Sequence, residues 1–278
     1  MTEPEQIDLL HGGHPHVLSS WLVGDVLVDP GPTSCLPTLL AALDGRELRA
    51  LALTHIHLDH AGAAGTLARR FPGLEVWVHE RGAPHLQDPA KLLASATRLY
   101  GSEHMERLWG EVAPVPEAQL RVLHGGERIA GLRVAYTPGH ASHHVAYLHE
   151  PSGDAFAGDV AGVRIGSGPV LAPTPPPDID LDAWRASIGT LEGWAPRRLV
   201  PTHFGAYDDV DAHLAELREE LERTAGRAGE LDEAAFAADL IERVRPLADE
   251  VDAAAYAHAL PGDQSYQGLR RHLERRER

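Results

Sequence analysis

Short apolar runs alternate with helix-like patterns over the first three quarters of the chain. The runs SSWLVG and VLVDPG, residues 19–24 and 26–31, predict two paired strands with a turn at Gly24 and Asp25. Beyond this pair, the apolar spacing predicts helices and strands in alternation. The predicted helices span 34–43, 61–71, 89–109 and 181–194, and the predicted strands span 47–55, 74–80, two or three segments within 120–140, 143–150, 154–160 and 197–203.

After about residue 208 the strand pattern stops and helical spacing continues. An apolar stripe with the spacing of helix faces is formed by Leu214, Leu217, Leu221, Phe236, Leu240 and Ile241. We therefore divide the chain into a domain over 1–207 and a C-terminal helical region over 208–278 that packs on it. The proline-rich stretch 172–180 is expected to be a stiff connector, since ordered patterns flank it.

Composition and charge exclude several classes of protein. The formal net charge of −16 leaves no basic footprint for nucleic acid. Residues 208–252 alone carry 15 Asp and Glu against 5 Arg, which indicates a solvated helical face. The single cysteine, Cys35, excludes an internal disulfide framework. No window approaches the roughly 18 continuous apolar residues of a membrane span, and the acidic N-terminus is unlike a signal peptide, so a cytoplasmic location is expected.

Metal-binding residue types are concentrated in the segment Thr54-His55-Ile56-His57-Leu58-Asp59-His60. It follows a predicted buried strand and precedes a predicted helix. On an extended chain His55 and His57 point to the same side, and the turn toward the helix can bring Asp59 and His60 to the same place. Imidazole and carboxylate groups are ligands of zinc and related divalent metals. Burying several such rings without partners would be costly, so a purely structural role is disfavoured.

Three later strands each end in a further ligand-type side chain. His140 follows Thr137-Pro138-Gly139, Asp159 follows Ala157-Gly158, and His203 follows Pro201-Thr202. Each of these signals is weak alone, because a histidine after a strand is common. Together, and in this order, they form a specific pattern.

The order HxHxDH, PGH, GD and TH resembles the metallo-β-lactamase superfamily in its glyoxalase II-like (hydroxyacylglutathione hydrolase-like) branch. Val28-Asp29-Pro30-Gly31 also resembles the early DPG or DTG turn of that family. The resemblance covers residues 20–205. It implies an α+β fold, a four-layer αββα sandwich with two mixed sheets face to face, helices outside and the site at one edge, here followed by the helical extension.

The resemblance also implies a ligand set. His55, His57 and His140 would hold one metal, Asp59, His60 and His203 would hold a second, and Asp159 would bridge them. Asp59 and Asp159 would therefore also be the catalytic carboxylates. The expected cofactor is two divalent metal ions, with zinc preferred and iron or manganese as alternatives. Asp29 is expected to accept a hydrogen bond from a ligand imidazole. His144 is expected to be structural, and no role is assigned to His11, His14, His16, His79, His85, His104, His124 and His149.

The activity that this set implies is metal-dependent hydrolysis of a small ester, thioester or lactone by a hydroxide bound between two metals. Two alternatives stay open: a mononuclear iron sulfur (persulfide) dioxygenase, and a metal-binding protein without catalysis. The chain departs from glyoxalase II in the run GDVAGVRIGSG after Asp159 and in its acidic helical region. It lacks the tyrosine that lactonases place shortly after that aspartate, since residues 160–163 are VAGV.

The expected partner is a small-molecule substrate, with neither nucleic acid nor membrane involved and a homodimer left open. A metal pair at a sheet edge needs a pocket, and the chain enters the helices directly after His203. We therefore expect the helices after residue 208 to form one wall of that pocket. Their acidity should disfavour polyanionic substrates.

Overall fold

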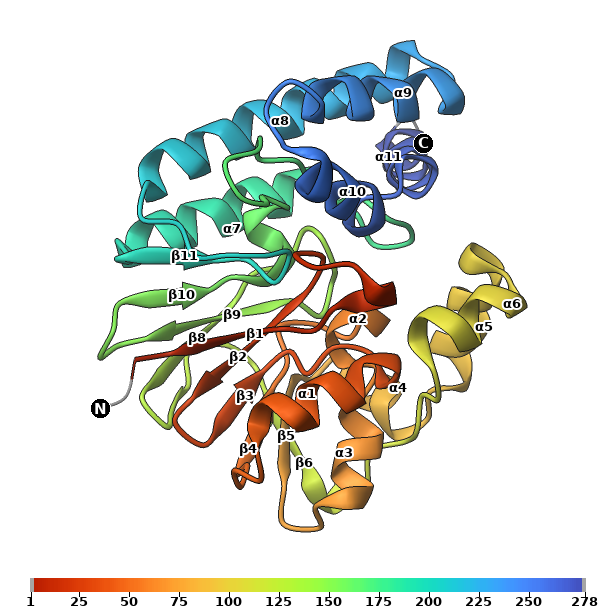
Figure 1. Cartoon of the computed structure of the whole chain (residues 1–278). Helices are drawn as coiled ribbons and strands as arrows, with labels where there is room; N and C mark the ends of the chain where they lie inside the picture. Colours follow the sequence, from red (N-terminus) through yellow and green to blue (C-terminus); the bar gives the residue numbers. More distant parts are fainter. Residues whose placement is uncertain (1–2, 277–278) are drawn as a thin grey trace.

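The computed structural model describes residues 3–276 and has two mixed β-sheets at its centre (Figure 1). The first sheet has the order β1 (Glu5–Asp8), β2 (Ser19–Val23), β3 (Val26–Val28), β4 (Ala50–Ala52), β5 (Glu75–His79) and β6 (Leu120–Leu123). The pairs β1–β2 and β2–β3 are antiparallel, and β3 to β6 are parallel. The second sheet has the order β11 (Arg198–Val200), β10 (Asp154–Phe156), β9 (Val145–His149), β8 (Leu132–Tyr136) and β7 (Arg128–Ile129), with only β10–β11 parallel.

The two sheets face each other across an apolar core. Trp77, Leu132, Tyr147 and Phe156 belong to one buried cluster that draws on both sheets. The ring centroids of Trp21 and Phe156, from opposite sheets, lie 5.9 Å apart. Burial of several aromatic side chains between the sheets provides much of the hydrophobic stabilisation of a sandwich.

Helices cover the outer faces of the sandwich (Figure 1). The first sheet is covered by α1 (Leu36–Leu43) and α3 (Ala64–Arg70), whose Leu39 and Leu67 are fully buried. The second sheet is covered by α7 (Leu181–Trp194). Asp180 caps the N-terminus of this helix, because its side chain accepts hydrogen bonds from the backbone N–H groups of residues 182 and 183. The predicted αββα architecture is confirmed.

Several element predictions need correction. Strand β1 was not predicted, because only Ile7 of its four residues is buried and pairing with β2 creates the strand. The short helix α4 (Ala83–Gln87) was not predicted either. The single helix predicted over 89–109 is wrong: the chain forms α5 (Ala90–Tyr100), α6 (Ser102–His104) and a π-helical turn η3 (Met105–Trp109). The break falls at Gly101, which has φ +78°, a conformation that ends a helix.

The C-terminal region consists of α8 (Val210–Glu230), α9 (Glu233–Val244), α10 (Glu250–Ala259) and α11 (Gly262–Arg276). Helix α8 packs against α7, and α11 packs against α8 and α9. The predicted apolar stripe is buried except at Ile241, which is 55% exposed. Ile241 follows Leu240 by about 100° of helix rotation and therefore points away from the neighbouring helices. Among residues 3–276, no helix combines the length and the apolar composition that a membrane span requires.

Candidate metal centre

The seven candidate donors lie in loops and short helical turns that follow strands of both sheets. His55 to His60 follow β4 and lead into the short helix α2 (Leu58–Ala61). His140 follows β8, Asp159 lies in the 3-10 turn η5 (Gly158–Ala161) after β10, and His203 follows β11. The structure brings all seven side chains together in two adjacent groups.

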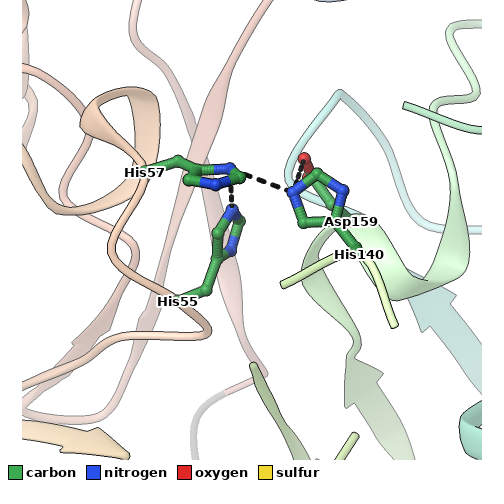
Figure 2. Close-up of side chains that lie close together, drawn as sticks. All are labelled: His55, His57, His140 and Asp159. Atoms are coloured by element: carbon green, nitrogen blue, oxygen red, sulfur yellow. Dashed lines mark hydrogen bonds and ion pairs between the residues drawn. The ribbon is translucent and has the colours of Figure 1, made fainter. Parts of the chain in front are cut away.

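The first group consists of His55, His57, His140 and Asp159 (Figure 2), with donor atoms all within 4.8 Å of one another. His57 Nδ1 lies 3.0 Å from both His55 Nε2 and His140 Nε2. His140 Nε2 lies 3.4 Å from Asp159 Oδ2. Three ring nitrogens from two segments therefore point to one place.

The second group consists of Asp59, His60 and His203. Asp59 Oδ2 lies 3.5 Å from His203 Nε2 and 3.7 Å from His60 Nε2. The other oxygen of Asp159, Oδ1, lies 3.2 Å from His60 Nε2 and 3.6 Å from His203 Nε2. One oxygen of Asp159 thus faces each group, which is the geometry of a bridging carboxylate.

Backbone carbonyls fix which nitrogen of two rings faces inward. His140 Nδ1 donates to the carbonyl of Pro173 at 2.8 Å, and His203 Nδ1 donates to the carbonyl of Val17 at 3.0 Å. A carbonyl oxygen only accepts, so in the neutral ring the proton sits on Nδ1. Nε2 of each ring then presents a lone pair to the centre, as a metal ligand does.

The carboxylate of Asp29 accepts the hydrogen bonds that connect the two donor groups. It is 1% exposed, and its Oδ2 accepts from His60 Nδ1 at 2.9 Å. Oδ2 also accepts from the hydroxyls of Thr54 at 2.7 Å and Thr202 at 2.8 Å, while Oδ1 accepts from the backbone N–H of Thr54 at 2.8 Å. Because the Thr54 hydroxyl donates to Asp29, its oxygen accepts from His55 Nδ1 at 3.1 Å. Asp29 therefore orients His60 directly and His55 through Thr54.

The electrostatics differ between the two groups. Burial lowers the pKa of His57 to about 4, and burial together with neighbouring rings holds the pKa of His55 well below its ordinary value. For His60 burial acts in the same direction, but Asp159, Asp59 and Asp29 outweigh it and raise its pKa. The second group therefore favours positive charge between its carboxylates.

The residues present fit divalent metal ions. His60 Nε2 and Asp159 Oδ1 are buried and lie 3.2 Å apart, yet neither atom makes a hydrogen bond with any of residues 3–276, although buried polar atoms are almost always paired. The donor set contains only imidazole nitrogens and carboxylate oxygens, which suits zinc, iron or manganese. A cation at each group would bind the inward lone pairs and supply the positive charge that the carboxylates favour.

Two glycines allow the donor loops to approach closely. A Cβ on Gly139, which has φ +140°, would lie 2.3 Å from Trp184 Cα. A Cβ on Gly158, which has φ +49°, would lie 2.7 Å from both His144 Nε2 and Thr54 Oγ1. Only glycine fits here, so the residues that precede His140 and Asp159 position these donors.

Several residues beside the donors were not predicted. His11 is 5% exposed, stacks on Trp109 with ring centroids 5.2 Å apart, and lines the same cavity as Asp59 and His203. Burial lowers its pKa to about 4. Tyr100, His104 and His258 line this cavity too. No spacing in the sequence links these residues, because they meet only through tertiary packing. His144 lies outside both donor groups and bonds through Nδ1 to the Thr137 hydroxyl at 2.9 Å.

Two facing mixed sheets, helices outside them and a histidine and aspartate cluster at the strand ends define a metallo-β-lactamase-type protein. A sequence profile of the metallo-beta-lactamase superfamily matches residues 15–203, and the chain belongs to that superfamily. Proteins of this superfamily are generally metal-dependent hydrolases.

The chain is similar to several curated proteins. An uncharacterised protein, YobT, of Bacillus subtilis is 32% identical over 44% of this chain and 50% of its own length. A metallo-beta-lactamase fold-containing protein of Sulfurisphaera tokodaii is 28% identical over 74% of this chain and 81% of its own. A hydroxyacylglutathione hydrolase of Aeromonas salmonicida is 31% identical over 48% of this chain and 41% of its own. The chain thus spans only about half the length of the first and third of these relatives.

Solved structures show the same fold. An archaeal metallo-beta-lactamase superfamily protein from Sulfolobus tokodaii has a TM-score of 0.69 at 21% identity, with 97% of this chain and 99% of the other covered. The protein TTHA1623, solved in a di-iron-bound form, has a TM-score of 0.53 at 27% identity, with 77% of this chain and 92% of the other covered.

Proposed function

We propose that the protein is a metal-dependent hydrolase that cleaves a small ester, thioester or lactone with two divalent cations, zinc being the preferred metal. The observation that carries this proposal is the shared carboxylate: Asp159 directs one oxygen to each of two complete donor groups. A structural zinc site would need only one closed group of four ligands. Two adjacent groups beside a cavity are typical of hydrolytic dimetal sites.

The chain supplies the ligands and their orientation. His55, His57 and His140 would hold one cation, and Asp59, His60 and His203 the other, with Asp159 shared. When bound, such a pair polarises a carbonyl and lowers the pKa of water toward neutrality. Asp29 and the carbonyls of Val17 and Pro173 keep the ligand rings in the required tautomer before substrate arrives.

We assign catalytic roles to Asp59 and Asp159, because both hold the proposed cations and line the cavity. The side chain of Asp59 is 22% exposed, so its carboxylate is accessible to a proton released during hydrolysis. Asp159 is 3% exposed and is fixed by its position between the groups.

The alternative is a mononuclear iron dioxygenase that uses two histidines and one aspartate. The di-iron form of TTHA1623 shows that a structural neighbour binds iron, so the metal is to be measured. The completeness of the second group, Asp59, His60 and His203, favours two cations over one.

The test is elemental analysis of purified, metal-reconstituted protein, followed by a screen of esters, thioesters, lactones and persulfides with oxygen uptake recorded. We expect two metals per chain and hydrolysis without oxygen uptake. His57→Ala and Asp159→Ala should abolish hydrolysis and leave the protein folded, whereas Cys35→Ser, at a buried thiol outside both donor groups, should leave hydrolysis intact. One iron per chain with oxygen consumption would replace the hydrolase by the oxygenase. Near-normal turnover of Asp159→Ala would remove the bridging role.

A further inference from the structure

A cavity of about 400 Å³ opens beside the two donor groups. Sites for small molecules usually have volumes of roughly 300–1,000 Å³. Apart from the donor residues, its lining is largely apolar. Most of the apolar lining residues come from α5, η3, the proline-rich stretch 173–177 and residues 257–261.

The first wall comes from α5 and η3. Leu58, Ala96 and Trp109 form a buried cluster, against which Leu92, Tyr100 and Leu108 pack. Tyr100 and Trp109 make an edge-to-face contact with centroids 5.0 Å apart. This wall is therefore a packed aromatic and aliphatic surface that offers contact area to an apolar group.

The second wall comes from the prolines of 173–177 and from residues 257–261 at the junction of α10 and α11. Figure 1 shows α5 and the α10–α11 pair at the same end of the sandwich. The Thr174 hydroxyl donates to the carbonyl of Ser265 at 3.0 Å, and a Cβ on Gly268 would lie 1.9 Å from the Thr174 carbonyl oxygen. Pro173 also accepts from His140 Nδ1. The second wall is therefore held in a fixed position relative to the first donor group.

The side-chain charge of the cavity lining is acidic rather than basic. No lysine or arginine is among the lining residues in the part of the chain described, and Asp263 is the carboxylate there outside the donor groups. Burial and the neighbouring His14 lower the pKa of His258, which disfavours the charged form of this ring. A carboxylate on a substrate would find no lysine or arginine side chain in the described lining to offset its desolvation, and would face Asp263.

We propose that the substrate is an uncharged ester or lactone whose alkyl or aryl group lies between the α5–η3 wall and the 173–177/257–261 wall. This inference rests on the proposed hydrolase function and names its substrate class. Hydrolysis adds water across the acyl–oxygen bond and gives a carboxylate, an alcohol and one proton. The carboxylate product, unlike the substrate, is charged, so the lining that favours the substrate disfavours the product. Anionic thioesters of glutathione are poor substrates on this argument.

The first experiment compares p-nitrophenyl acetate, butyrate, hexanoate and octanoate with lactoylglutathione on the reconstituted enzyme. Each buried methylene is expected to raise kcat/KM about fourfold until the cavity is filled. Octanoate should therefore exceed acetate by a hundredfold or more, and lactoylglutathione should be cleaved more slowly than hexanoate. A chain-length profile that is flat, or a preference for lactoylglutathione, would overturn the inference while leaving the hydrolase function intact.

A matched pair of variants tests the wall itself. Leu99→Arg places a cation in the lining, whereas Leu93→Arg places one on the same helix outside it. Leu99→Arg should reduce the octanoate-to-acetate ratio at least tenfold and raise the relative rate on lactoylglutathione, and Leu93→Arg should change neither. Equal effects of the two substitutions would overturn the inference.

Binding of alcohols tests the apolar cavity separately from the proposed hydrolase function. Calorimetric titration of 1-butanol, 1-hexanol and 1-octanol requires no turnover. Affinity that rises about fourfold per methylene, and is lost in Leu99→Arg, supports the apolar cavity even if no hydrolysis is found. Absence of any chain-length dependence in the wild-type protein would overturn it even if esters are cleaved.

Discussion

Asp29 offers a sharp test of how the protein prepares its metal ligands. Its carboxylate accepts four hydrogen bonds, from Thr54 N–H, the Thr54 and Thr202 hydroxyls and His60 Nδ1. Asp29 also has φ +47°, in the left-handed region that asparagine tolerates. The substitution Asp29→Asn therefore keeps the backbone and the shape of the side chain and removes the charge.

The expected loss in the free energy of unfolding follows from the hydrogen bonds that Asp29→Asn weakens. If the amide oxygen replaces Oδ2, the two hydroxyls and His60 keep an acceptor, but one without charge. The new NH₂ group then faces the N–H of Thr54, so two donors meet. Hydrogen bonds to a charged acceptor contribute about 1.5–3 kcal/mol and neutral ones about 1 kcal/mol. Because the four bonds share one group and are not additive, we expect the free energy of unfolding to fall by about 2–4 kcal/mol.

Metal affinity should fall as well, by about 10- to 100-fold, because His60 and His55 lose the partner that orients them. Urea denaturation measures the first effect and chelator competition the second. Asp44→Asn is the matched control, since Asp44 has φ +45° but is exposed. If Asp29→Asn matched Asp44→Asn in both unfolding free energy and metal affinity, the assignment of Asp29 as the orienting group would be refuted.

Three further outcomes are expected. Burial lowers the pKa of His213 to about 4 in the folded protein, whereas in the unfolded chain the ring is protonated below about pH 6.5. The uncharged buried ring therefore stabilises the fold above pH 6.5, and this stabilisation is lost as the pH falls toward 4. Between pH 7 and pH 4, the free energy of unfolding measured by urea denaturation should fall by about 1–3 kcal/mol less in His213→Gln than in the wild type. His124→Gln, which changes a largely exposed ring, is the control and should show the same fall as the wild type. Gly268→Ala should lower the melting temperature strongly, because its Cβ would clash with the Thr174 carbonyl oxygen. Gly226→Ala in α8, with nothing within 4 Å of the added carbon, should stabilise the protein by about 0.5–1 kcal/mol. A higher melting temperature for Gly268→Ala than for Gly226→Ala would contradict the packing described. EDTA should lower the melting temperature of metal-loaded protein, and this decrease should be smaller in His57→Ala, which lacks one donor of the first group and keeps the second group; an equal decrease in both proteins would contradict metal binding by the first group.

The sequence predicted those features that depend on neighbours in the chain. The β2–β3 hairpin follows from two short apolar runs and from Gly24 between them, which takes φ +64° in the turn. The donor segment His55 to His60 could be found because all of its ligands lie within one strand end and one helix start. The later donors His140, Asp159 and His203 could be grouped only through the resemblance, since nothing in their spacing shows that three strand ends meet.

Features that depend on packing between distant segments could not be predicted from the sequence. Strand β1 exists because β2 pairs with it, not because its own residues favour a strand. His11 was set aside as one of many histidines, yet the fold stacks it on Trp109 and places it in the cavity. Leu214 and Phe236 were predicted to be buried and are, but the part of the C-terminal region that contributes to the second wall is residues 257–261, which carry no strong apolar pattern.

The position of that second wall has a consequence for how such proteins diverge. The superfamily match ends at residue 203, so residues 173–177 of the second wall lie within it and residues 257–261 lie beyond it. None of residues 257–261 is in either donor group. Substitutions there can therefore change what fits in the cavity without altering the ligand set. Two members of the superfamily with identical donor motifs can thus separate in substrate by drift in a segment that the motifs do not cover, and similarity over the shared segment is a guide to chemistry rather than to substrate.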